Sequence, residues 1–145
     1  MGIALDSDRN IFVAEFGGQT VKEILASTGY VTTNTLASGL HGPTSVALDS
    51  SGNVFFTEQD AGHVKEILAV GGVIPPSNPT INTLGSGIQH SEGVAVDSSG
   101  NVFVADETAK TVKELVAVGG VIPSTNPTIR MLGSGLVGPH QCSRG

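Results

Sequence analysis

The stretch GVAVDSSGNVFVAD at residues 93–106 decides the fold, because closely related stretches occur twice earlier in the chain. SVALDSSGNVFFTE occupies residues 45–58, and GIALDSDRNIFVAE occupies residues 2–15. Each stretch holds two short apolar runs separated by a polar turn. Repetition at this spacing is typical of propellers and solenoids.

Two further apolar runs complete each unit. The third runs are residues 21–25, 64–68 and 112–116, and the fourth contain Thr35-Leu36, Thr83-Leu84 and Met131-Leu132. Four short strands per unit are typical of a propeller blade. We therefore predict an all-β chain, a β-propeller of three four-stranded antiparallel blades forming an incomplete ring. The predicted units are blade 1 at residues 1–42, blade 2 at 43–90, blade 3 at 91–139, and a non-repeat tail at 140–145.

The spacings show where the units differ in length. The step from Asp6 to Asp49 is 43 positions and that from Asp49 to Asp97 is 48, while each of these aspartates precedes its lysine (Lys22, Lys65, Lys113) by 16. The five extra residues fall between the third and fourth strands, in the proline-bearing stretches 71–79 and 119–127. Length variation confined to a loop is what repeat folds tolerate. These loops carry Val and Ile at their tips, and we expect them to serve mainly in packing.

The turn between the first two strands has its own chemistry. In Asp49-Ser-Ser-Gly52-Asn53 the carboxylate can accept backbone amides while Gly52 takes a positive φ, and Asp97 with Gly100 repeats this arrangement. The first unit places Arg9 at the glycine position, where a left-handed backbone costs about 1 kcal/mol. Unit 1 is therefore the least regular of the three.

Composition excludes several classes of protein. The 145 residues include 20 Gly, 7 Pro and no Trp, and the formal charge is -6 with only seven Lys and Arg, so a basic grip on nucleic acid is disfavoured. The single cysteine, Cys142, rules out an internal disulfide framework. No stretch has the apolar length of a membrane span, and residue 1 leads directly into a strand without a signal peptide. We therefore expect either a cytoplasmic protein or a gene whose start is missing. Richness in Gly, Ser, Thr and Val is similar to that of extracytoplasmic bacterial repeat proteins, which favours an exported parent protein.

The pattern Gly-Val-Ala-Val-Asp-Ser-Ser-Gly-Asn followed by Val-Lys-Glu resembles the NHL repeat, most closely in units 2 and 3, and the resemblance covers residues 2–139. It implies a propeller of about six blades whose first strands line a central channel. Such proteins serve mostly as binding platforms for proteins, RNA or glycans. A few related propellers are lyases or lactonases, including the gluconolactonase-like enzymes, with a metal in the channel.

Three blades leave two terminal faces without a neighbour. Either further blades of a parent chain or a second copy must cover them. Residues 140–145 also stand where a fourth first strand is expected, and removing one base from a back-translation of them restores Thr-Ser-Val-Ala-Val. We therefore expect a frameshift there, with a genuine non-repeat end as the alternative.

The recurring charged residues have a structural and a functional interpretation. We interpret Asp6, Asp49 and Asp97 as turn caps rather than metal ligands, and Glu15, Glu58 and Asp106 as structural rather than as an acidic site. Lys22, Lys65 and Lys113, with the glutamates that follow them, are expected to form ion pairs between blades.

Residues that break the repeat are the better functional candidates. His41, His63 and His90 stand at nonequivalent positions without metal-ligand spacing. Glu92 replaces the Thr44 position and is a weak candidate for a carboxylate ligand. We therefore favour a noncatalytic scaffold without a cofactor that binds a protein or glycan. The alternative is a propeller enzyme of the lyase or lactonase kind with a divalent cation.

Overall fold

The computed structural model describes residues 1–137, so the expected tail at 140–145, with His140 and Cys142, lies outside the described residues. Residues 1–137 form three four-stranded sheets and one short 3-10 helix. Sheet 1 contains β1 (Gly2–Leu5), β2 (Ile11–Glu15), β3 (Thr20–Ile24) and β4 (Thr33–Ala37), with η1 (Ala26–Thr28) before β4. Sheet 2 contains β5 (Pro43–Leu48), β6 (Val54–Glu58), β7 (His63–Ile67) and β8 (Ile81–Gly85). Sheet 3 contains β9 (Ser91–Val96), β10 (Val102–Asp106), β11 (Thr111–Leu115) and β12 (Ile129–Leu132).

Within each sheet every strand pairs antiparallel with the next strand along the chain. This meander follows from the short polar turns between apolar runs, which join neighbouring strands directly. The register is equivalent in the three sheets, since Lys22, Lys65 and Lys113 lie opposite Val13, Phe56 and Val104 respectively. Repeated sequence positions therefore have repeated positions in space.

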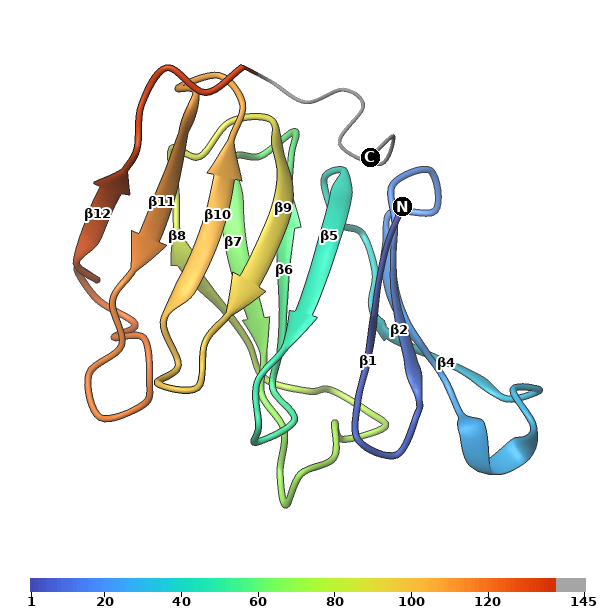
Figure 1. Cartoon of the computed structure of the whole chain (residues 1–145). Coiled ribbons are helices and arrows are strands. Elements are labelled where there is room, and N and C mark those ends of the chain that lie inside the picture. The colour runs from blue at the N-terminus through green and yellow to red at the C-terminus, as the bar shows by residue number, and fades with distance from the viewer. Residues whose placement is uncertain (138–145) are drawn as a thin grey trace.

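The three sheets stack face to face in chain order, and their first strands β1, β5 and β9 lie side by side (Figure 1). We call the face that carries Val54, Phe56 and Glu58 in sheet 2 the front face, and the face that carries Phe55 and Thr57 the back face. The front face of sheet 2 packs on the back face of sheet 1 in a core that includes Phe12 and Phe56. The front face of sheet 3 packs on the back face of sheet 2 in a second core that includes Phe55 and Leu115.

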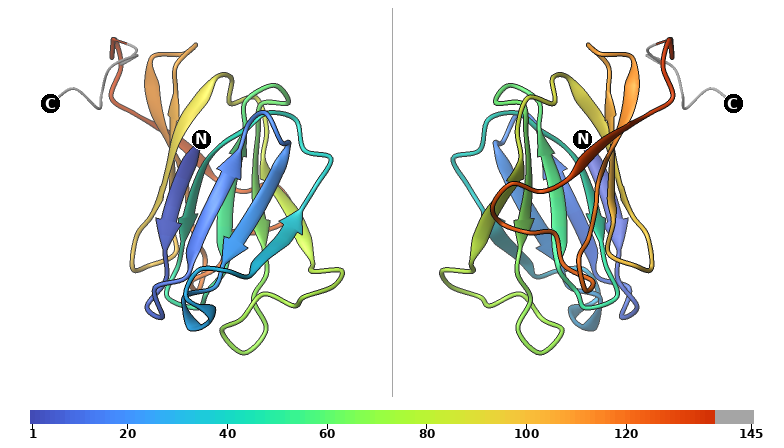
Figure 2. Two further views of the ribbon diagram at one scale, coloured as in Figure 1. Left: turned by 90° about the vertical axis from the view of Figure 1, so that its right-hand side faces the viewer. Right: turned by 90° about the vertical axis from the view of Figure 1, so that its left-hand side faces the viewer.

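Sheet 2 is buried on both sides, and every residue of β6 is buried. The front face of sheet 1 and the back face of sheet 3 have no neighbouring sheet among residues 1–137, and the three sheets do not close a ring. Figure 2 views these two ends of the stack, with sheet 1 in blue toward the viewer on the left and β12 in red on the right.

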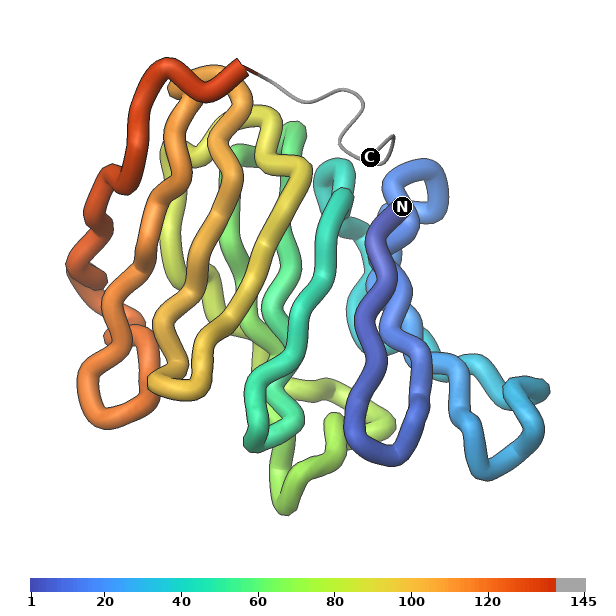
Figure 3. The backbone as a smooth tube through the Cα atoms, viewed as in Figure 1, coloured from blue at the N-terminus to red at the C-terminus, as the bar shows by residue number. Residues whose placement is uncertain are grey.

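The connections between the third and fourth strands differ as the spacings predict. In sheets 2 and 3 they are long loops, which project from the lower edge of the stack (Figure 3). Ile74 and Ile122 are buried in the two cores, whereas Val73 and Val121 are about 60% exposed. Only the isoleucines therefore pack as expected. In sheet 1 the shorter connection forms η1, which the sequence analysis did not predict; the Thr28 hydroxyl donates to the Leu25 carbonyl there.

No helix in the described part of the chain is long and apolar enough to cross a membrane.

Candidate functional site

The turn aspartates hold the lower ends of the first two strands together. The Asp49 carboxylate accepts the backbone amides of Ser51 and Asn53 at 2.9 Å and the Asn53 side-chain amide at 2.8 Å. Asp97 and Asn101 repeat all these contacts. Asp6 accepts the backbone and side-chain amides of Asn10 in the same way, without a bond that matches the one from Ser51. The Asn101 side-chain amide is the main cause that holds the pKa of Asp97 below its ordinary value. These carboxylates therefore all make bonds within their own turns.

Each turn asparagine also reaches the end of the third strand. Asn10, Asn53 and Asn101 accept the backbone amides of Ala26, Ala69 and Ala117 at 2.8 to 2.9 Å, always 16 positions later. The constant spacing seen in the sequence therefore has a physical cause, because this bond fixes the length of the chain between the turn and the third strand.

The recurring lysines pair with other carboxylates than the sequence analysis expects. The ammonium groups of Lys22, Lys65 and Lys113 lie 2.7 to 2.9 Å from the carboxylates that end the second strand of the same sheet, namely Glu15, Glu58 and Asp106. Ion pairs between sheets were the wrong expectation, because lysine and carboxylate lie diagonally across two neighbouring strands on one face. Lys113 also contacts the neighbouring blade, because its ammonium donates a hydrogen bond to the Gly87 carbonyl at 3.1 Å.

Sheet 2 surrounds its ion pair with two histidines. The Glu58 carboxylate is fully buried, accepts the His41 backbone amide at 3.0 Å and lies 2.9 Å from the Lys65 ammonium. The Nδ1 atoms of His41 and His63 lie 3.7 and 3.5 Å from its two oxygens. We call His41, Glu58, His63 and Lys65 the Glu58 cluster. Sheets 1 and 3 have Thr20 and Thr111 in place of His63, so the cluster is specific to sheet 2.

Burial opposes the ionisation of Glu58, but its hydrogen bonds outweigh burial. The Lys65 ammonium and the His41 amide together hold the pKa of Glu58 below its ordinary value. The carboxylate is therefore charged at neutral pH, and its negative charge faces the two imidazoles. The side chain of His41 is 70% exposed and that of His63 is 36% exposed, so the cluster presents histidines at the surface.

A surface groove lies beside the Glu58 cluster. The Gln59 side-chain amide lies 3.0 Å from Nδ1 of His90, across the gap between the β6–β7 turn and the segment before β9. The groove has a volume of about 480 Å³. We call its lining residues the upper groove: Gln59, Asp60, Ala61, Gly62, Gly87, Gln89 and His90.

The sequence analysis singled out these histidines without placing them together. His41 precedes β5, His63 begins β7 and His90 precedes β9, so their separations along the chain follow no metal-ligand motif. His41 and His63 meet at Glu58 and His90 meets Gln59, because linkers and β-turns lie at the same end of a sheet. Glu58 was weighed as part of an acidic site and interpreted as structural, whereas Gln59 was missed. The signal that could have found Gln59 was the departure of its neighbours from the repeat.

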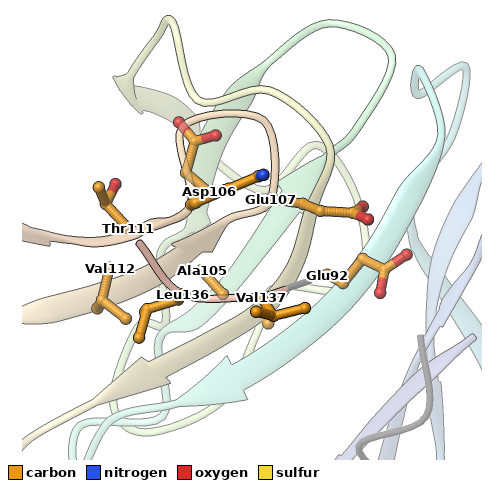
Figure 4. A pocket seen from close by; sticks show the side chains of 10 residues that line it. Glu92, Ala105, Asp106, Glu107, Thr111, Val112, Leu136 and Val137 are labelled. Atoms are coloured by element: carbon orange, nitrogen blue, oxygen red, sulfur yellow. The ribbon is translucent and has the colours of Figure 1, made fainter. Parts of the chain in front are cut away.

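Glu92 lies elsewhere, on the exposed side of β9. It borders an apolar pocket of about 390 Å³ on the back face of sheet 3. Figure 4 shows the apolar side chains of Ala105, Val112, Leu136 and Val137 gathered there, with the carboxylates of Glu92 and Glu107 to one side. The pocket is a part of the open sheet face. Among residues 1–137 no group of three or more His, Cys, Asp and Glu side chains is arranged to hold a metal ion.

The comparisons with known proteins identify the architecture. No protein-family model and no curated protein matches the chain. A chain in the crystal structure of a nidogen/laminin complex is similar, with a TM-score of 0.70 and 18% identity over 93% of this chain and 48% of that one. Virginiamycin B lyase from Staphylococcus aureus is similar in its selenomethionine form, with a TM-score of 0.67 and 14% identity over 94% of this chain and 41% of that one. Its catalytically inactive histidine-to-alanine variant with quinupristin gives a TM-score of 0.63 and 15% identity, over 90% of this chain and 39% of that one.

These similarities show the fold alone. The sheets are blades of a propeller-type protein, as the repeat predicts, and the chain spans less than half the length of each of these relatives.

Proposed function

We propose that the chain is a segment of an NHL-type propeller that serves as a binding scaffold for a protein or glycan. The proposed binding surface comprises the upper groove and the exposed histidine of the Glu58 cluster. The observation that carries this proposal is that the recurring and the non-recurring polar residues have different surroundings. Those that recur in every blade are engaged in turns and ion pairs, whereas His41, Gln59 and His90 break the repeat and lie at the surface.

Function in a repeat fold is expected where the repeat is broken, because the recurring positions are needed to build each unit. An imidazole and a primary amide held by hydrogen bonds can donate to and accept from a carbohydrate hydroxyl or a peptide group. The propeller relative in a complex of nidogen with laminin supports a binding role, since it is seen with another protein. The motif around Asp49 and Asp97 supports the NHL type.

A labelled sample of the 145-residue chain, applied to a glycan array and a protein array, tests the scaffold role. We expect a binding partner whose signal falls at least tenfold in the double variant His41→Ala, Gln59→Ala. The matched control is Asp8→Ala, which removes an exposed polar side chain from the opposite, lower edge. No partner on either array, or an equal loss in the control, contradicts the proposal.

The alternative is a metal-dependent propeller enzyme of the lyase or lactonase kind. It is favoured by Glu92 beside an apolar pocket and by the virginiamycin B lyases among the similar structures. A divalent cation that binds only the folded chain raises the melting temperature. Measuring Tm first with EDTA and then with excess Mg²⁺, Ca²⁺ or Mn²⁺ distinguishes the enzyme from the scaffold. A rise in Tm that Glu92→Gln abolishes favours the enzyme, and an unchanged Tm favours the scaffold.

A further inference from the structure

The open front face of blade 1 has the composition of an interface. Ile3 and Leu5 are 66% and 61% exposed, whereas Val46, which matches Ile3 in blade 2, is 5% exposed. Val46 is covered because the back face of blade 1 packs on it. The front face of blade 1 therefore exposes apolar side chains of the kind that blade 2 buries against a back face.

The open back face of blade 3 is the complementary surface. Ala105 is exposed there, and Val112 is half-buried, whereas Thr57 and Val64 at the matching positions of blade 2 are fully buried. Leu136 and Val137 extend this apolar surface and are 47% and 87% exposed. The face is also the site of the apolar pocket, which an incoming blade would fill.

A recurring hydrogen bond joins successive blades. The linker that leaves each blade donates its amide to the carboxylate at the end of the next blade's second strand, as His41 does to Glu58 and Gln89 to Asp106. The residue before each donor is itself fixed, because Leu40 donates to the Gln19 carbonyl and Ile88 to the Gly62 carbonyl.

The two open faces carry the two halves of this bond. After blade 3 the Leu136 amide donates to the Lys110 carbonyl, which places Val137 where His41 and Gln89 stand. In blade 1 the Glu15 carboxylate is 31% exposed, whereas Glu58 and Asp106 are 0% and 2% exposed. Val137 thus offers the donor and Glu15 offers the acceptor.

The first strands show the same complementarity. A Cβ on Gly2 would lie 2.7 Å from the Thr44 carbonyl oxygen, so glycine allows β1 and β5 to approach closely. Gly93 has the matching place in β9, because Gly2 lies opposite Ala14 and Gly93 opposite Ala105. A Cβ on Gly93 would contact only the Ala105 side chain, at 3.8 Å. Gly93 thus leaves room for another first strand at close approach.

We propose that a second copy of this chain covers both faces, with the front face of blade 1 of each copy on the back face of blade 3 of the other. Two such head-to-tail contacts close a ring of six blades. The size fits, since 93% of one copy covers 48% of the propeller relative in the nidogen/laminin complex. This inference does not depend on the proposed ligand-binding role.

Light scattering coupled to size-exclusion chromatography tests the proposal on the 145-residue chain. We expect a mass of about twice the 14.7 kDa of one copy, unchanged between micromolar and hundred-micromolar concentrations. The front-face variant Ile3→Glu, Leu5→Glu is expected to be monomeric, because it breaks both contacts of the ring. The matched control is Val31→Glu, which changes an 83% exposed valine outside both faces and is expected to remain dimeric.

Mixing two disabled variants tests the head-to-tail arrangement. The back-face variant Ala105→Glu, Val112→Lys is expected to be monomeric alone, and its mixture with the front-face variant keeps one intact contact. The mixture should therefore form a heterodimer at high concentration. A folded wild-type monomer, a polymer that grows with concentration, dimers that persist in either variant, or a mixture without heterodimer overturns the proposal. Circular dichroism of each variant verifies that its blades are folded.

Discussion

Replacing Glu58 by glutamine isolates the charge of the one fully buried carboxylate in the Glu58 cluster. Glutamine keeps the shape of the side chain but leaves the Lys65 ammonium, 2.9 Å away and 20% exposed, without its counter-charge. Hydrogen bonds to charged groups contribute about 1.5–3 kcal/mol each, and breaking a buried ion pair costs about 3–5 kcal/mol. Because Lys65 keeps some contact with solvent, we expect a loss of about 2–4 kcal/mol, which lowers Tm by roughly 6–12 °C at about 3 °C per kcal/mol.

The pH dependence gives this prediction its sign. Because the folded-state pKa of Glu58 is lowered, its contribution to stability is present above the unfolded pKa and is lost as the pH falls through the folded pKa. The difference in Tm between wild type and Glu58→Gln should thus be largest at pH 7 and shrink below about pH 4.3, the ordinary pKa of a glutamate.

Thermal unfolding followed by circular dichroism at one fixed protein concentration measures both effects. Asp8→Asn, which neutralises an exposed carboxylate, is the control and should leave Tm nearly unchanged. Equal Tm values for wild type and Glu58→Gln at pH 7, or a difference that is as large at pH 3 as at pH 7, would refute the assignment of stability to this charge.

Three further predictions concern individual positions and are read by the same melting experiments. Burial, more than the charge of Asp49, raises the pKa of Glu66. The contribution of Glu66 to the free energy of unfolding is therefore most favourable at low pH and is lost as the pH rises through the raised pKa. Glu66→Gln should consequently raise Tm at pH 7 and not at pH 3. Gly52→Ala places a Cβ 2.7 Å from the Gly72 carbonyl oxygen at φ +84°, whereas Gly71→Ala at φ +61° meets no atom within 4 Å. Gly52→Ala should lower the free energy of unfolding by more than about 2 kcal/mol, and Gly71→Ala should lower it by about 1 kcal/mol. Equal losses would contradict the steric argument. Arg9 has φ +68°, so Arg9→Gly should relieve about 1 kcal/mol of strain and raise Tm by a few degrees, with an unchanged or lower Tm as the contrary result.

The strands and turns could be predicted because each blade repeats a local pattern. The alternation of apolar residues around Asp49 and Asp97 and the glycines at the turns determine hairpins without reference to distant residues. The fourth strands were found from their place in the repeat, because Ile129–Leu132 is exposed throughout and has little apolar signal of its own. Helix η1 could not be predicted, since the chain around Thr28 has no counterpart in the other blades.

The candidate site could be predicted only in part, because it depends on which chain segments meet at one end of a sheet. The departure of His41 and His63 from the repeat was visible in the sequence. Their shared approach to Glu58 was not, because it requires the linker before β5 and the first residue of β7 to lie beside the end of β6. The true partner of Lys65 was missed for the same reason, since a diagonal pair across two strands depends on register.

The bond from each turn asparagine to the alanine 16 positions later also defines where the chain can be altered. It encloses the second and third strands of a blade, so the loop that begins after Ala69 lies outside the enclosed segment. A peptide epitope grafted between Gly71 and Gly72 would therefore be displayed on an anchored base. Because Ala117 is anchored in the same way, blade 3 offers a second such position, and the chain could carry two different epitopes on one edge of the molecule.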